Sequence, residues 1–391
     1  MQTSPEHRRS VLVVDDEPGM RYMARRVFEH RFDVMDAGSG EEALELLERH
    51  EFNFAVVDVS LPGLSGLKLL TRIKEHRPDI DVVVMTGSAS DPDEALEDAI
   101  RRKAFFFLRK PFPMTVLETL ADRIVQNQEL SEQLDDQIKT LQKDLEAARI
   151  FQKRLLPPEN WTGNRIEVGS RYVASDRLSG DFLDCWALPD GGTALLIADV
   201  MGHGPSAAMA TGMIKSQVQR LTENIEAPGA VLSALEDDFS RHQIRGFLTT
   251  FLVFDRPERG VLQYAGAGHP SARLRPGPDG EIVQLHSDGL PLNTVYGVVE
   301  RQSTEIERVP GSRILLHTDG YSEATGKGGQ LFDEPWPEGG STQETPFLRA
   351  VERALDASTI AGSIDSLESD LAEFESGAEE DDRAVLIAGL H

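Results

Sequence analysis

Short apolar runs alternate with amphipathic segments over the first third of the chain. The apolar runs lie at residues 11–15, 33–35, 54–58, 82–86 and 105–108, and they are separated by helical patterns such as those at 41–50 and 66–76. Strands that alternate with helices in this way predict an α/β domain with a doubly wound parallel sheet of five strands. Phe105 and Phe106 are expected to lie in its core. Such sheets place their functional groups at the carboxyl ends of the strands.

Residues 113–156 follow a different period, in which seam positions recur at spacings of three and four. The seam consists of Leu120, Ile124, Asn127, Ser131, Leu134, Ile138, Leu141, Leu145, Ala148, Gln152 and Leu155. This heptad pattern predicts one helix, ~60 Å long at 1.5 Å per residue, which ends before Pro157. The seam either packs on the chain's own domains or pairs with a second copy, and its three good heptads favour a parallel dimeric coiled coil.

The remaining residues combine strand pairs that are close in sequence with a few helices. Strand-like runs lie at 192–200, 247–255, 260–269, 313–320 and 383–390, and helical patterns lie at 205–222, 228–243 and 346–375. This arrangement predicts an α+β domain with largely antiparallel sheet. The predicted organisation is therefore a first domain at 9–122, a helical coiled-coil linker at 123–158 and a second domain at 159–391.

Composition narrows the range of partners and compartments. The chain has 391 residues with a formal net charge of −26, so it lacks the basic footprint that nucleic-acid binding requires. It contains no run of ~20 apolar residues that would span a membrane, and its first ten residues do not resemble a secretory signal. The single cysteine, Cys185, fits a reducing compartment. We expect a cytoplasmic protein that binds neither nucleic acid nor membrane.

Five side chains with complementary chemistry follow strands of the first domain. Asp15 and Asp16 come at the end of the first strand, Asp58 ends the third, Thr86 ends the fourth and Lys110 follows the fifth. These strand ends share one edge of a parallel sheet, where three carboxylates favour a cation such as Mg²⁺. The group predicts a carboxylate that accepts a phosphoryl group, with a metal ion and an ammonium to neutralise its oxygens.

The same residues resemble the receiver domain of two-component response regulators, which has a flavodoxin-like fold. The matching motifs are DD at 15–16, DVSLPGLSG at 58–66, MTG at 85–87 and KPF at 110–112. The resemblance implies that a sensor histidine kinase phosphorylates Asp58 and that Mg²⁺ binds at Asp15, Asp16 and Asp58. It also implies that the receiver switch consists of Thr86, Phe107 and Lys110.

Four acidic motifs mark the second domain, each at the edge of a strand-like run. They are SGDFLD at 179–184, ADVMGHG at 198–204, HTDGYSEA at 317–324 and EDDRAV at 380–385. Acids that converge from separate strands require cations or pairing, because isolated buried carboxylates are costly. The sequence has neither a zinc-type His/Cys cluster nor a G-x-S-x-G nucleophile motif. We therefore expect metal-assisted hydrolysis at phosphorus with two metal ions.

These motifs resemble the SpoIIE-type branch of the PPM metal-dependent protein phosphatases over residues 160–391, and the segments at 148–158 and 265–270 also match. The resemblance implies an antiparallel β-sandwich flanked by helices, which binds two Mn²⁺ or Mg²⁺ ions and hydrolyses phosphoserine or phosphothreonine on a partner protein. By analogy that partner is an anti-sigma-factor antagonist. The implied catalytic metal ligands are Asp181, Asp199, Asp319, Asp381 and the carbonyl of Val200, with Asp382 as the alternative to Asp381.

Two readings of the second domain remain open at this point. Ser179 and Ala384 depart from the usual family pattern, as does the pair at 332–333, and neither His203 nor Arg177 has an assigned role. A non-catalytic adaptor that binds a sigma-factor regulator is the alternative to a phosphatase. Because an adaptor has no need to retain all four acids, the complete set favours the enzyme.

Overall fold

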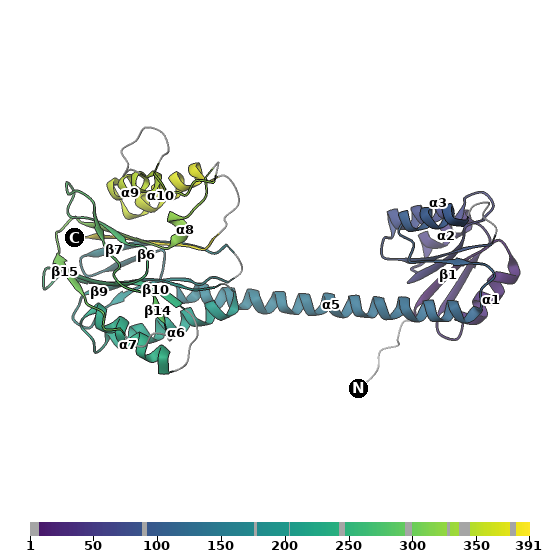
Figure 1. The fold of residues 1–391 in the computed structure, drawn as a ribbon, viewed down its shortest axis with the longest axis horizontal. Coiled ribbons are helices and arrows are strands. Elements are labelled where there is room, and N and C mark those ends of the chain that lie inside the picture. Colours follow the sequence, from purple (N-terminus) through teal and green to yellow (C-terminus); the bar gives the residue numbers. More distant parts are fainter. Residues whose placement is uncertain are drawn as a thin grey trace. The chain divides into compact units, whose positions relative to one another are not determined.

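The structure is a computed structural model, and it is described here in two units. It describes residues 8–87, 92–175, 178–202, 204–241, 247–293, 299–326, 329–335, 345–375 and 381–391. The compact units are Met1–Lys139 and Thr140–His391. Helix α5 (Met114–Leu155) contributes residues to both units, and its bounds confirm the long helix expected at 113–156 (Figure 1).

The first unit contains a parallel sheet in the order β2-β1-β3-β4-β5. Its strands are β1 (Ser10–Val14), β2 (Asp33–Ala37), β3 (Phe54–Asp58), β4 (Asp81–Thr86) and β5 (Phe106–Arg109). Its helices besides α5 are α1 (Pro18–Phe28), α2 (Gly40–Arg49), α3 (Gly66–His76) and α4 (Pro92–Arg101). This topology confirms the doubly wound fold that the alternating pattern predicts.

Alternate residues of the central strands fill two cores, one on each face of this sheet. On β1, Val11 and Val13 pack with α1 and the start of α5, whereas Leu12 and Val14 pack on the opposite face with α2 and α3. A strand that is buried on both faces has a continuous apolar sequence, so it can be recognised from the sequence alone. The two cores fix the strand ends that carry the candidate acids.

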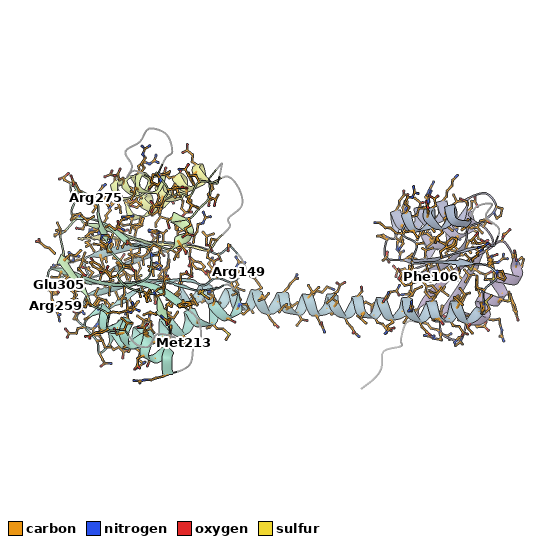
Figure 2. All side chains as sticks on the ribbon, viewed as in Figure 1. Phe106, Arg149, Met213, Arg259, Arg275 and Glu305 are labelled. Carbon is orange, nitrogen blue, oxygen red and sulfur yellow. The ribbon has the colours of Figure 1, made fainter. Side chains whose placement is uncertain are left out.

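The expectation that both Phe105 and Phe106 lie in the core is wrong for Phe106. Phe105 packs against the core on the α1 side, but the Phe106 side chain is 42% exposed (Figure 2). Strand β5 pairs on one side only, with β4, so it is an edge strand of the sheet. Side chains on an edge strand are covered less completely than those on a central strand, and an apolar run does not reveal which strand is central.

The seam of α5 divides into three parts with different surroundings. Leu120 and Ile124 are buried in the first unit's core, and Gln152 is buried in the second unit. These two ends therefore do not face a partner helix, which corrects the assignment of the whole 120–155 seam to a coil. Between them, the exposed fractions of Leu134, Ile138 and Leu141 are 56%, 44% and 59%. A dimeric coil remains a prediction for this middle part.

The second unit contains two antiparallel sheets. One sheet consists of β8 (Asp181–Ala187), β9 (Thr193–Val200), β10 (Phe247–Arg256), β11 (Val261–Ala267), β14 (Leu292–Asn293) and β15 (Thr304–Glu307). The other consists of β6 (Asn160–Gly163), β7 (Ile166–Val173), β12 (Ala272–Arg275), β13 (Val283–Leu285), β16 (Arg313–His317) and β17 (Arg383–Leu390). A shared core lies between the two sheets, so they form a sandwich.

Helices cover both outer faces of the sandwich (Figure 1). Helices α6 (Pro205–Thr222) and α7 (Pro228–Arg241) pack on the β9–β10 sheet, and α9 (Pro346–Asp356) and α10 (Ile360–Phe374) pack on the β16–β17 sheet. The single helical pattern expected at 346–375 is thus two helices, because α9 ends before Ala357 and Thr359 caps α10. A short helix, α8 (Asp319–Ser322), follows β16. The layers confirm the predicted sandwich flanked by helices.

None of the described helices is both long enough and apolar enough to cross a bilayer.

Candidate functional site

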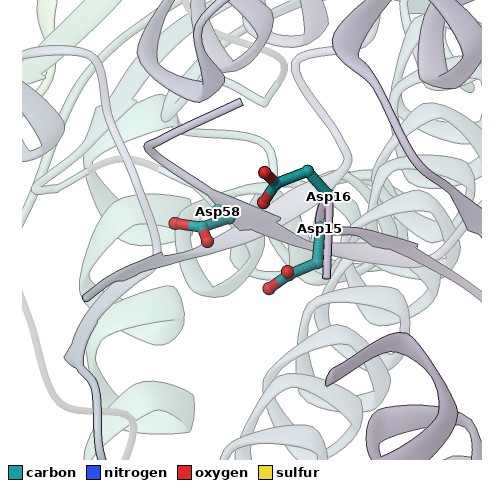
Figure 3. A group of neighbouring side chains, drawn as sticks. All are labelled: Asp15, Asp16 and Asp58. Atoms are coloured by element: carbon teal, nitrogen blue, oxygen red, sulfur yellow. The ribbon is translucent and has the colours of Figure 1, made fainter. Parts of the chain in front are cut away.

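Three carboxylates gather at the carboxyl edge of the receiver-like sheet. Asp15 and Asp16 follow β1 and Asp58 ends β3, and one oxygen of each lies within 4.8 Å of the others (Figure 3). Asp15 and Asp58 are buried, whereas Asp16 is exposed. Gly66, at the start of α3, allows close packing here, because a Cβ on it would lie 1.9 Å from the Asp58 carbonyl oxygen. The cluster offers hard oxygen ligands of the kind that Mg²⁺ prefers.

Lys110 supplies the positive charge of this cluster. Its Nζ donates to Asp15 Oδ2 at 2.7 Å and to Asp58 Oδ2 at 2.6 Å. Burial alone would lower the pKa of Lys110, but the two hydrogen-bonded carboxylates raise it above its ordinary value. Burial raises the pKa of Asp15, although the hydrogen bond from Lys110 opposes that effect. The ammonium therefore holds the two buried acids together.

Thr86 and Phe107, which the resemblance assigns to a switch, lie on the last two strands of the sheet. Thr86 ends β4 and is buried, and its Oγ1 has no hydrogen-bond partner among the described residues. A buried hydroxyl without a partner is costly unless another group approaches it, so it suits a phosphoryl oxygen on Asp58. Phe107 lies on β5 and is half-buried against the core on the α2 and α3 side. All six receiver residues named from the sequence thus lie where the pattern placed them, on strand ends or on β5.

The four acids of the second unit arrive from four different elements. Asp181 begins β8 and is the direct cross-strand partner of Asp199 on β9. Asp319 begins α8, directly after β16, and Asp381 stands two residues before β17. Both sheets therefore contribute acids to one group. Among the described residues, three carboxylates with oxygens within 4.8 Å of one another are found in the receiver cluster and not in this group.

Burial and neighbouring charges both affect the pKa values of these acids. Burial raises the pKa of Asp181 well above its usual range, and the charges of Asp199 and Asp319 raise it further. Burial raises the pKa of Asp199 to about 7, with contributions from Asp319 and Asp381. Burial and the charge of Asp381 also raise the pKa of Asp319. Divalent cations would relieve this repulsion, so the acids offer carboxylate oxygens that suit metal ions.

Asp381 and Asp382 are adjacent in the sequence but differ in exposure and in hydrogen bonding. Asp382 is buried and accepts hydrogen bonds from Ser175 N at 2.8 Å, from Ser175 Oγ at 2.9 Å and from Gly180 N at 3.3 Å. Asp381 is exposed, and one of its oxygens accepts from the Asp382 amide. Asp382 thus anchors the segment that leads to Asp181. Asp381 has the more accessible carboxylate, which favours it as the ligand.

The backbone approaches this group closely at Gly180. A Cβ on Gly180 would lie 2.4 Å from the Val200 carbonyl oxygen and 2.9 Å from that of Gly202. A larger residue would therefore displace the Val200 carbonyl expected to bind metal. Gly202 and Gly204 have φ of +98° and +82°, which glycine adopts without strain. His203 and Arg177 lie outside the described residues.

Three further residues change the interpretation of the acidic motifs. Asp184, in the same motif as Asp181, pairs instead with Lys215 at 3.1 Å and Gln219 at 2.9 Å on α6. Gln152 of α5 donates to the Ser179 carbonyl at 2.7 Å. Thr318 donates to Asp181 at 2.6 Å. The sequence reasoning missed the last two roles, because neither residue type identifies its partner in a distant segment.

Comparisons with known proteins identify both units. The family model described as Stage II sporulation protein E (SpoIIE) matches residues 189–391, and the response regulator receiver domain model matches residues 11–122. The phosphoserine phosphatase RsbP of Bacillus subtilis is 30% identical over 192 residues, which is 47% of this chain and 46% of RsbP. The transcriptional regulatory protein GlrR of Escherichia coli is 27% identical over 53% of this chain and 48% of its own.

A solved structure supports the same assignment of the fold. The SiaA-PP2C domain of Pseudomonas aeruginosa aligns with 65% of this chain and 98% of its own, with 20% identity and a TM-score of 0.53. The chain spans about half the length of the curated relatives it matches. The SpoIIE model covers more than half of the chain. The chain therefore belongs to the SpoIIE family and carries an N-terminal response regulator receiver domain ahead of its PP2C-type phosphatase domain.

Proposed function

We propose that the second domain hydrolyses phosphoserine or phosphothreonine on a partner protein, and that phosphorylation of Asp58 controls this activity. The observation that carries the proposal is the convergence of four acids at one place in the fold. Burial and neighbouring negative charges raise the pKa values of three of them, Asp181, Asp199 and Asp319. An adaptor would gain nothing from keeping such a destabilising group. The similarity to a phosphoserine phosphatase supports a phosphoserine substrate.

We assign two Mn²⁺ or Mg²⁺ ions to this group. The residues that would hold them are Asp181, Asp199, Asp319, Asp381 and the carbonyl of Val200. When bound, such ions supply an activated water and neutralise charge on the phosphoryl group. The chain's own contribution is to fix the carboxylates: Asp382 anchors the segment before Asp181, and pairing of β8 with β9 sets Asp181 opposite Asp199.

In the receiver we assign Asp58 as the phosphoacceptor and a sensor histidine kinase as the donor. The phosphoryl group leaves a histidine nitrogen of the kinase, and a new P–O bond forms to an Asp58 carboxylate oxygen. Asp15 and Asp16 would hold Mg²⁺ beside it. Lys110 lies 2.6 Å from Asp58, and the Thr86 hydroxyl, which has no partner among the described residues, is suited to a phosphoryl oxygen.

We also propose a homodimer with domain limits at 9–122, 123–158 and 159–391. The support is the exposed apolar stripe of Leu134, Ile138 and Leu141, which recurs at heptad spacing on one face of α5. A second copy would cover this stripe. We further propose that the substrate is an anti-sigma-factor antagonist, by analogy with related phosphatases.

The deciding experiment measures phosphate release from phosphorylated antagonist proteins. The full chain is assayed with Mn²⁺, with Mg²⁺ and with a chelator, before and after treatment with acetyl phosphate. We expect metal-dependent turnover whose rate changes when the receiver is phosphorylated. Tight binding of the antagonist without turnover under any of these conditions would instead indicate the adaptor.

A further inference from the structure

Thr318 lies between β16 and α8 and is completely buried. Its Oγ1 is 2.6 Å from Asp181 Oδ2 and 2.9 Å from the amide nitrogen of Ala384. The Ala384 amide donates to this oxygen, so the single hydroxyl proton is available for another acceptor. The Ala384 carbonyl oxygen is 3.5 Å away, too far for a good hydrogen bond. The proton therefore goes to Asp181.

The N-terminal caps of other helices show that this use of the hydroxyl is specific. Thr345 and Thr359 also precede helices, and their hydroxyl oxygens accept from Leu348 N and Gly362 N, each at 3.1 Å. Such bonds are the usual role of threonine at this position. Thr318 precedes α8 but makes no side-chain cap bond. Its hydroxyl instead joins Asp181 of one sheet to the backbone at β17 of the other.

We propose that Thr318 is a positioning residue for the metal site, whose hydroxyl holds Asp181 Oδ2 and leaves Oδ1 for a cation. This inference rests on the proposed metal-dependent function. Asp181 is buried and has no lysine or arginine partner among the described residues, so its orientation depends on such a bond. Hydrogen bonds to metal ligands typically change metal affinity by about 10–100-fold.

Calorimetric titration of Mn²⁺ into the full chain tests the proposal without using activity. All proteins carry Asp16→Asn, which removes one acid from the receiver cluster. We expect Thr318→Val to weaken Mn²⁺ binding by about 10–100-fold and Thr318→Ser to stay within about threefold of the parent. The matched control is Thr250→Val, since Thr250 is equally buried but donates to the Ile197 carbonyl at 2.8 Å. It should leave Mn²⁺ affinity unchanged.

Thermal unfolding without metal shows whether each variant folds. Should Thr318→Val fail to fold, Thr318→Cys, whose thiol is only a weak donor, replaces it with the same expectation. Unchanged Mn²⁺ affinity in Thr318→Val, or equal losses in the Val and Ser variants, would overturn the proposal. Thr318-dependent Mn²⁺ binding without phosphoprotein hydrolysis would reject the proposed activity alone. Hydrolysis with unchanged affinity in Thr318→Val would reject the positioning role alone.

Discussion

The receiver's acid cluster contains its own counter-charge, whereas the phosphatase cluster has none among the described residues. Lys110 donates to both Asp15 and Asp58. Neither lysine nor arginine pairs with Asp181, Asp199 or Asp319 in the described part of the chain, and the pKa of each is raised. Lys110 therefore offsets part of the negative charge of the receiver cluster. In the phosphatase cluster, burial and neighbouring negative charges both disfavour ionised carboxylates, so a cation or a proton would stabilise the group.

The two clusters also differ in what their polar neighbours do. In the part of the chain that the structure describes, the buried Thr86 hydroxyl of the receiver has no partner. The phosphatase uses comparable groups to hold its acids, since Thr318 bonds Asp181 and Ser175 bonds Asp382. A site that gains and loses a phosphoryl group needs an open hydrogen-bonding position. A site that keeps metal ions through many turnovers needs fixed ligands.

The largest expected effect comes from breaking the phosphatase cluster. Asp199→Asn together with Asp319→Asn should lower phosphatase activity at least about a thousandfold, because metal ions contribute several kcal/mol to transition-state stabilisation. Phosphate release in Mn²⁺ buffer measures this loss. The control is Asp184→Asn, a buried acid in the motif of Asp181 that pairs with Lys215 instead. Activity in the double variant that a chelator does not affect would contradict metal-dependent catalysis.

A substitution of Asp58 in the receiver cluster tests whether this residue accepts the phosphoryl group. Asp58→Asn should reduce labelling by acetyl phosphate at least about tenfold, because an amide does not replace the carboxylate nucleophile. Labelling is measured by mass spectrometry of the intact chain. Asp79→Asn is the control, since Asp79 is an exposed acid outside the cluster. Stable labelling of Asp58→Asn equal to wild type would show that the phosphoacceptor lies elsewhere.

The connection between the two clusters is tested through the exposed stripe of α5. Leu134→Ala with Leu141→Ala should weaken dimerisation at least about tenfold, because a lost packed leucine costs more than the 1.4 kcal/mol that corresponds to that factor. Phosphatase activity should then stop responding to receiver phosphorylation. Light scattering and paired activity assays measure both effects. Gln133→Ala with Gln142→Ala changes the same helix outside the seam and serves as the control. A double leucine variant that dimerises and responds normally would make the stripe a passive surface.

The sequence predicts the receiver more completely than the phosphatase for a physical reason. In a parallel sheet, each apolar run ends where its strand ends, and the carboxyl ends of the strands lie together. The apolar runs alone therefore place Asp15, Asp58 and Thr86 at that end of the sheet. In the sandwich, neighbouring acids differ only in their tertiary partners. Asp381 and Asp382 are adjacent in sequence, yet one is exposed and the other holds Ser175.

The two incorrect predictions, which placed Gln152 in a coiled coil and Phe106 in the core, have a related cause. Gln152 continues the heptad period of α5, but it is buried against Ser179 of the second unit. Phe106 belongs to an apolar run, but it lies on an edge strand. A periodic pattern shows which face of an element is distinct. It does not show which surface of the folded chain, or of another chain, covers that face.

The smallest expected effect is on the thermal stability of the second domain. Burial raises the pKa of Asp199 to about 7 in the folded chain, above its ordinary value of 3.8. Between these values the folded state binds more protons than the unfolded state, so the metal-free protein loses stability as pH rises from about 4 to about 7. Asp199→Asn removes that loss. At pH 8 without metal, it should raise the melting temperature of the second domain by about 2–4 °C per kcal/mol regained.

With saturating Mn²⁺, wild type should instead melt at a higher temperature than Asp199→Asn. Mn²⁺ binding to the folded state stabilises wild type, whereas the variant lacks a ligand. Calorimetric melting at pH 4 and pH 8, with Mn²⁺ and with chelator, measures all four conditions. At pH 4 the difference should nearly vanish, since Asp199 is protonated there in the folded chain. Asp365→Asn, on an exposed acid, should change stability by no more than about 0.5 kcal/mol throughout. If Asp199→Asn melts lower than wild type in chelator at pH 8, the acids do not repel one another in the metal-free protein, and the contrast with the Lys110-stabilised receiver cluster is wrong.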